Sequence, residues 1–210
     1  KLKETIKANQ TNKEGKIVVL YTSNKDAQHS YIADAKTKGY EVILLDSPIV
    51  PHLIQKLEMD NQEVIFTRVD ADSIENLIKK DEEVISKLSE TETTKLKEEV
   101  EKAVAGKQYN IQTEALDSNA APFLITQPEF MRRMKEMQAM GGGNMFRNFP
   151  ETYNVIVNTN SEIASKIINE ENEAVKTNLI KQALDLAKLA QGLLKGEELT
   201  EFVKRNFEKI

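Results

Sequence analysis

Three short, largely apolar runs near the start of the chain constrain its fold more than any other feature. They are KIVVLYT (16–22), EVILL (41–45) and EVIFTR (63–68). Helix-like stretches lie between them, at 25–38 and 48–59, and Gly39 ends the first of these. Apolar strands that alternate with helices are typical of a parallel sheet covered on both faces. The sequence therefore predicts a three-layer βαβαβ lobe over residues 16–71.

A second unit is predicted after this lobe. Residues 1–14 read as a linker or a truncated element, and a charged helical stretch from Asp72 or Ser73 to Ala105, interrupted near 89–94, is the expected connector. Strands are then expected at 108–116, 123–126 and 152–158, with a helix from Pro128 to Met140 and three closing helices. The predicted fold class is α/β for residues 1–80, followed by a mixed α+β domain over 81–210 that ends in a helix pair.

The charge and cysteine content exclude several functions. The chain has 210 residues, a formal net charge of −5 and no cysteine. A net negative charge argues against binding to nucleic acid or to an anionic membrane. Without cysteine there is neither a disulfide nor a thiolate, which fits a reducing compartment, and we expect a cytoplasmic protein.

Five of the six methionines lie between residues 131 and 145. They recur every third residue from Met131 to Met140, which places them along one stripe of the predicted helix. We expect the charged residues between them, such as Arg132 and Arg133, to face solvent. Such a stripe is either part of a core or, because the thioether is flexible and polarisable, an adaptable binding surface. The candidate binding residues are Phe130, Met131, Met134, Met137, Met140, Met145 and Phe146.

No residue pattern predicts an active site. The glycines at 141–143 follow a helix, where an anion is disfavoured, so they do not form a phosphate loop. Asp70 and Asp72 are expected to cap the next helix rather than to bind a metal. His29 and His52 lie in different elements without a triad pattern.

The last two predicted helices carry more apolar residues than one buried face requires. Two such helices at a terminus either pack within their own chain or join a second copy in a four-helix bundle. The candidate dimer-interface residues are Leu184, Ala187, Leu193, Leu194, Leu199, Phe202 and Val203.

The order of these segments resembles one family. The quoted segments are KIVVLYTS, GYEVILLDSPI, PFLITQPEFMRRMKEMQAMGGG, YNVIVNTNSE and QALDLAKLAQGLLKGEELTEFVKR. Together they resemble the end of the middle domain and the C-terminal domain of the bacterial heat-shock protein 90 chaperones. One departure lies at Pro48-Ile49, where the family commonly continues with an acidic pair and this chain has Val50-Pro51.

The resemblance implies a role in an ATP-driven homodimeric chaperone. It implies that the last two helices form the dimer and that Met131, Met134, Met137 and Met140 contact unfolded or partly folded client proteins. Other chaperones are further candidate partners. The ATP and magnesium site of the family belongs to an N-terminal domain, and its catalytic arginine is expected upstream of Lys1. We therefore expect no cofactor and no ATP hydrolysis in this fragment.

A second function of a different class remains open at this point. The first strand exit, Thr22 to Lys25, is polar and precedes a helix, so the lobe is alternatively a small phosphate- or nucleotide-binding α/β protein.

Overall fold

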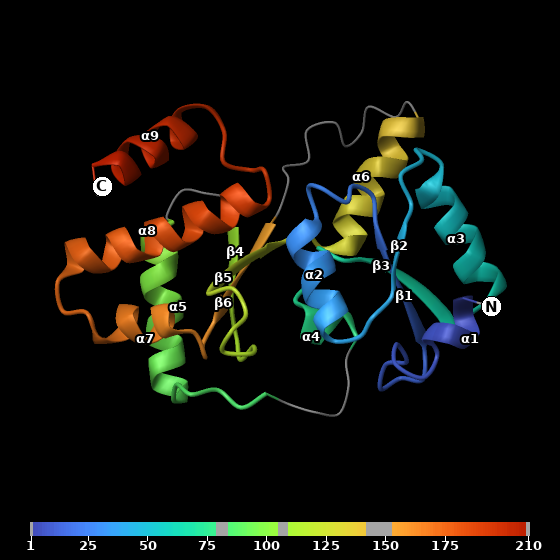
Figure 1. Ribbon diagram of the computed structural model, residues 1–210, viewed down its shortest axis with the longest axis horizontal. Coiled ribbons are helices and arrows are strands. Elements are labelled where there is room, and N and C mark those ends of the chain that lie inside the picture. The colour runs from blue at the N-terminus through green and yellow to red at the C-terminus, as the bar shows by residue number, and fades with distance from the viewer. Residues whose placement is uncertain (1, 79–83, 105–108, 142–152, 209–210) are drawn as a thin grey trace. The chain divides into compact units, whose positions relative to one another are not determined.

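The computed structural model describes residues 2–78, 84–104, 109–141 and 153–208, without the side chains of residues 138–141 (Figure 1). Their contacts form two units, each of which is considered by itself. The first combines residues 1–83 with 126–153, and the second combines 84–125 with 154–210.

The first unit contains the predicted parallel sheet. Its elements are α1 (Leu2–Ile6), β1 (Ile17–Thr22), α2 (His29–Thr37), β2 (Val42–Leu44), α3 (Val50–Asp60), β3 (Val64–Arg68), α4 (Ile74–Leu77) and α6 (Glu129–Gly141). The strand order is β2-β1-β3 and both pairings are parallel. The three predicted strands and the α/β class of this lobe are confirmed.

The central strand β1 is buried along its whole length. On one face Ile17 and Val19 form a core cluster with Ile6 and Val64. Of the two alternatives predicted for residues 1–14, a linker or a structural element, the burial of Ile6 in α1 excludes the linker. Because the first helix supplies a core side chain, this segment is part of the lobe.

The connector contains two helices with an interruption between them, as predicted, but the interruption comes before residue 90 instead of over 89–94, and the first helix is short. Helix α4 has only four residues, and α5 (Glu90–Ala103) begins at Ser89, whose hydroxyl forms a capping box with Glu92. Asp70 pairs with Arg68 instead of capping a helix, while Asp72 accepts a hydrogen bond from the Ser73 N–H. The capping box of Ser89 and Glu92 therefore fixes where the second helix of the connector begins.

The second unit contains the mixed α+β arrangement. Its elements are α5, β4 (Tyr109–Glu114), β5 (Phe123–Thr126), β6 (Tyr153–Asn158), α7 (Glu162–Asn169), α8 (Glu173–Ala190) and α9 (Gly196–Phe207). The strand order is β4-β6-β5, with β6 in the centre, and α5 packs against β4, α7 and α8. These strands and the three closing helices agree with the sequence prediction.

Helix α6 packs in the first unit, although the sequence was divided at residue 80 and the helix assigned to the second domain. It contacts α3, and its first residue, Glu129, accepts hydrogen bonds from Tyr21 and from the backbone of Arg68. The charged side chains of α6 produce this grouping, and their partners are far away in the sequence.

The exit of β6 is held by buried amide side chains. Asn158 is fully buried, and its Oδ1 accepts hydrogen bonds from the N–H groups of Leu116 and Asn160. Asn160 donates to the carbonyl groups of Ile85 and Leu116, at 3.0 Å each. It also accepts a hydrogen bond of 2.7 Å from the N–H of Lys87. This motif therefore fastens the loop before α5 to the end of the central strand.

Replacing Asn160 by alanine should destabilise the chain by about 1–3 kcal/mol, because buried backbone groups lose their partners. Urea denaturation followed by circular dichroism measures this change. Asn110→Ala is the matched control, since the Asn110–Asn154 hydrogen bond is exposed and its loss should cost less. Equal effects of the two substitutions would contradict a structural role for Asn160.

Candidate functional site

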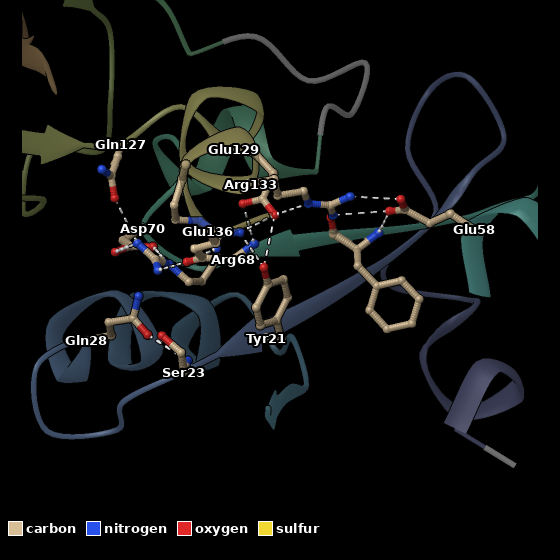
Figure 2. A network of polar contacts seen from close by, with 12 residues as sticks. Tyr21, Ser23, Gln28, Glu58, Arg68, Asp70, Gln127, Glu129, Arg133 and Glu136 are labelled. Atoms are coloured by element: carbon tan, nitrogen blue, oxygen red, sulfur yellow. Dashed lines mark hydrogen bonds and ion pairs between the residues drawn. The ribbon is translucent and has the colours of Figure 1, made fainter. Parts of the chain in front are cut away.

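Helix α6 turns its charged side toward its own lobe (Figure 2). The residues at positions i, i+3, i+4 and i+7 share one side of a helix, and here they are Glu129, Arg132, Arg133 and Glu136. Arg132 is only 4% exposed. The expectation that the arginines of this helix face solvent was therefore wrong. We call these side chains and their partners on the lobe the α6 network.

Glu129 is the central acceptor of the α6 network. Its Oε1 accepts hydrogen bonds from the Tyr21 hydroxyl at 3.0 Å, from Arg133 Nε at 2.6 Å and from Arg132 Nη2. Its Oε2 accepts the backbone N–H of Arg68 at 3.3 Å. One carboxylate thus joins the first turn of α6 to both β1 and β3.

Arg68 at the end of β3 holds the other side of the network. Its Nε and Nη2 bind the two carboxylate oxygens of Asp70 at 2.6 and 2.9 Å, which is the strong bidentate geometry. Arg68 Nη2 also donates to Gln127, and its Nη1 lies 3.6 Å from Glu136. Arg132 Nη1 binds the same Glu136 oxygen at 2.6 Å. Glu136 is therefore shared by the two arginines.

Arg133 links α6 to α3. Its Nη1 lies 2.8 Å from Oε2 of Glu58, and its Nη2 lies 3.2 Å from Oε1. A largely buried charge that lost its partner would carry an uncompensated desolvation cost. The paired arginines and carboxylates therefore specify which side of α6 faces the lobe.

The opposite side of α6 is apolar and faces water. Phe130 is 71% exposed and Met134 is 39% exposed, whereas Met131 and Met137 are half-buried. The side chain of Met140, together with Met145 and Phe146, lies outside the described residues. An amphipathic helix usually buries its apolar side. Helix α6 departs from this arrangement, because Arg132 and Arg133 face the lobe while Phe130 and Met134 are exposed.

The polar groups at the end of β1 already have hydrogen-bond partners within the chain. Gln28 Oε1 accepts hydrogen bonds from the Thr22 hydroxyl and from the N–H groups of Ser23 and Asn24. A phosphate needs such N–H groups for itself. The alternative of a phosphate or nucleotide site at this turn is therefore not supported.

Helices α8 and α9 are joined by polar pairs. Asp185 binds Arg205 at 2.5 Å, Gln182 donates to Asn206 at 3.1 Å, and Lys188 pairs with Glu198. Beneath these pairs, four of the predicted interface residues are buried within the single chain: Leu184, Ala187, Leu194 and Phe202. Leu193 and Leu199 are half-buried, and Val203 is exposed.

A second set of apolar side chains on these helices faces water. Leu186 is 50% exposed and Phe207 is 71% exposed, and the same set includes Val175, Leu189 and Val203. All except Val203 were absent from the predicted interface. The sequence feature that points to them is the large share of the helix circumference that is apolar. A helix buries one apolar face in its own unit, so apolar residues beyond that face stay exposed.

Within the described parts of the chain, no group of three or more His, Cys, Asp or Glu side chains is arranged to hold a metal ion. Among the same residues, no helix is long and apolar enough to span a membrane.

Replacing Tyr21 by phenylalanine should reduce the sensitivity of the chain to alkaline pH. Burial, assisted by the charge of Glu129, raises the pKa of Tyr21 above its usual value of 10.0. The folded state therefore favours the protonated phenol, and this contribution to stability is present below pH 10 and is lost as the pH rises further. Urea denaturation at pH 8 and pH 11 should show a smaller loss for Tyr21→Phe than for the unsubstituted chain. An equal loss in both proteins would contradict this assignment.

Comparison with known proteins identifies relatives of this chain. It is 38% identical over 184 residues to the chaperone protein HtpG of Porphyromonas gingivalis, an alignment that covers 86% of this chain. It is 31% identical over 274 residues to HtpG of Bacteroides thetaiotaomicron and 28% identical to that of Bacteroides fragilis, with 98% of this chain covered in each case. Because 274 exceeds the 210 residues here, these relatives contain residues without a counterpart in this chain. No family model matches the chain.

The aligned segments amount to 27% of the Porphyromonas relative and 40% of each Bacteroides relative. The matches run along most of this chain, so they include both structural units. This chain is therefore a homologue of the HtpG chaperones of the heat-shock protein 90 family, and it corresponds to part of their length.

Proposed function

We propose that this chain supplies the dimerisation and client-binding functions of an ATP-dependent molecular chaperone, and that ATP is bound and hydrolysed by another part of the protein. The observation that carries the proposal is the orientation of α6. The charged side of α6 contacts the lobe, so its apolar side stays available to another molecule.

An exposed apolar surface made of methionine and phenylalanine suits a partner whose sequence varies. Exposed apolar patches on soluble proteins mark sites of interaction. The thioether of Met134 is flexible and polarisable, so it adapts to side chains of different shapes, and Phe130 offers a large contact area. These properties match the short apolar segments that unfolded proteins expose.

Replacing Phe130 and Met134 together by serine should weaken client binding without unfolding the chain. Exposed positions usually change stability by less than about 0.5 kcal/mol each. The measurement is the suppression of light scattering by thermally unfolding citrate synthase, accompanied by urea denaturation of the variant. Lys135→Ser is the matched control, because Lys135 is exposed on the same helix and is not apolar.

The control should suppress scattering as well as the unsubstituted chain does. If the double variant also did so while remaining folded, the outer side of α6 would not be the client surface. A large loss of stability would show instead that these side chains belong to the core.

The exposed apolar side chains of α8 and α9 support self-association. The inner set, with Leu184 and Phe202, already forms the core of the unit, so the outer set makes no contribution to that core. A second copy presents the same surface, and a two-fold axis pairs it with itself. Stable dimers of this kind usually bury about 2,000 Å² or more.

Glutamate at Leu189 or Val203 should convert a dimer into a folded monomer. Each side chain is exposed in the single chain, so the charge is tolerated there but is desolvated in an interface. Light scattering coupled to size-exclusion chromatography at micromolar concentration reports the mass, and circular dichroism reports the fold. Ile49→Glu, at an exposed apolar residue of the first unit, is the matched control and should remain dimeric. An unchanged dimer mass for Leu189→Glu and Val203→Glu would rule out this interface.

A further inference from the structure

The strand β3 lies at one edge of the first sheet, and two hydrogen bonds show which of its residues face outward. Ile17 donates its N–H to the carbonyl of Glu63 at 2.8 Å, and Val69 donates its N–H to the carbonyl of Tyr21 at 2.9 Å. Since alternate residues of a strand bond to opposite sides, the odd-numbered residues pair with β1. The backbone groups of Val64, Phe66 and Arg68 therefore point away from β1. The Val64 N–H donates to the Asn61 carbonyl and the Arg68 carbonyl accepts from the Ala71 N–H. The edge groups that a neighbouring strand would use are therefore the N–H and C=O of Phe66 and the N–H of Arg68.

Charged side chains occupy this edge where a neighbouring strand would bind. The Phe66 N–H donates to Glu58 Oε1 at 2.7 Å, and its carbonyl accepts a hydrogen bond from Arg133 Nη2. The Arg68 N–H donates to Glu129 Oε2 at 3.3 Å. Figure 2 shows Glu58, Arg133 and Glu129 side by side along this edge. Three side chains from two helices thus satisfy consecutive outward groups of β3.

An exposed strand edge binds other chains, and proteins usually protect such edges permanently. The protection here comes from side chains of α3 and α6, which bond to the edge and are joined to each other by the Arg133–Glu58 ion pair. Displacing three side chains from the edge removes these polar contacts, and a strand that takes their place restores the backbone hydrogen bonds. The backbone groups of β3 would thus keep hydrogen-bond partners if a peptide backbone replaced the three side chains.

We propose that the outer edge of β3 is a docking site for an extended segment of an unfolded client, and that the side chains of Glu58, Glu129 and Arg133 hold it closed. The inference rests on the proposed function, because unfolded clients supply the extended segment. The segment adds a strand beside β3, with its carbonyl and N–H groups bonded to Phe66 and Arg68 in place of the three side chains.

Recognition through the backbone explains how one site serves many sequences. The N–H and C=O groups of an extended segment recur in every protein, whereas its side chains differ. The apolar outer side of α6, with Phe130 and Met134, then provides a contact for side chains that does not depend on their exact shape. The β3 edge would bind the backbone of a client segment, and the outer side of α6 would bind its side chains.

A pair of peptides tests the proposal. One is a capped heptapeptide of alternating threonine and valine, and the other is the same peptide with its backbone nitrogens methylated at alternate residues. Methylation removes N–H donors without changing the side chains, so it prevents strand addition. The double substitution Glu129→Gln with Arg133→Gln keeps the net charge and weakens the cover of the edge.

The double variant should bind the unmethylated peptide roughly tenfold more tightly than the unsubstituted chain does, because at least one charge-assisted hydrogen bond no longer competes. The methylated peptide should show no such gain. In nuclear magnetic resonance spectra, the amide signals of Phe66 and Arg68 should shift only with the unmethylated peptide. Equal binding of the two peptides, or binding that leaves both amide signals unmoved, would overturn the proposal.

Two further variants keep the test decisive. Glu58→Gln retains an acceptor for the Phe66 N–H but weakens the ion pair with Arg133, so it should act in the same direction even if the double variant unfolds. Glu99→Gln with Lys102→Gln removes an ion pair from α5 in the other unit and should leave peptide binding unchanged.

Citrate synthase aggregation is measured on the same proteins to separate the two ideas. Suppression by the unsubstituted chain, together with equal binding of both peptides, would overturn the edge site alone. Absence of suppression, with a clear difference between the peptides, would overturn the proposed client-binding function and leave the strand site standing.

Discussion

The carboxylate of Glu129 is the interaction on which the arrangement of the first unit depends. It accepts hydrogen bonds from a tyrosine on β1, two arginines on its own helix and a backbone N–H of β3. Arg132 is buried, and a buried guanidinium is stable only while carboxylates balance its charge. The orientation of α6 about its axis follows from this requirement. Rotating the helix to bury its apolar side would move Arg132 and Arg133 away from Glu58 and Tyr21.

This constraint also explains why apolar side chains remain exposed on α6. The lobe already has its own core, built from Ile17, Val19 and Val64 on one face of β1, and it does not need the methionines. The helix pair of the second unit reaches a similar result by another route. There the apolar arc exceeds what one unit buries, so Leu184 and Phe202 form the core while Leu186 and Phe207 stay outside. Charge pairing in one case and surplus apolar area in the other leave surfaces available to a second molecule.

The same polar contacts also protect the edge of β3. The residues that orient α6 are those that satisfy Phe66 and Arg68 along the open edge. A change that loosens the helix therefore uncovers the strand edge, whereas Phe130 and Met134 are exposed even while the helix is docked. Most proteins cover such edges because they promote aggregation. In the proposed edge site, one set of side chains would serve both protection and client binding.

Much of the fold followed from local patterns, because strands and helices depend on residues that are close in the sequence. The apolar runs at 16–22, 41–45 and 63–68 were sufficient to predict a parallel sheet. The order of the segments was sufficient to predict the family. Helical periodicity showed that the methionines and the arginines of α6 lie on different sides, but not which side faces inward. That was decided by partners distant in the sequence, since Glu58 and Arg133 are 75 residues apart. The cover on the β3 edge exists only when these residues meet, because an ion pair acts through space and leaves no local pattern.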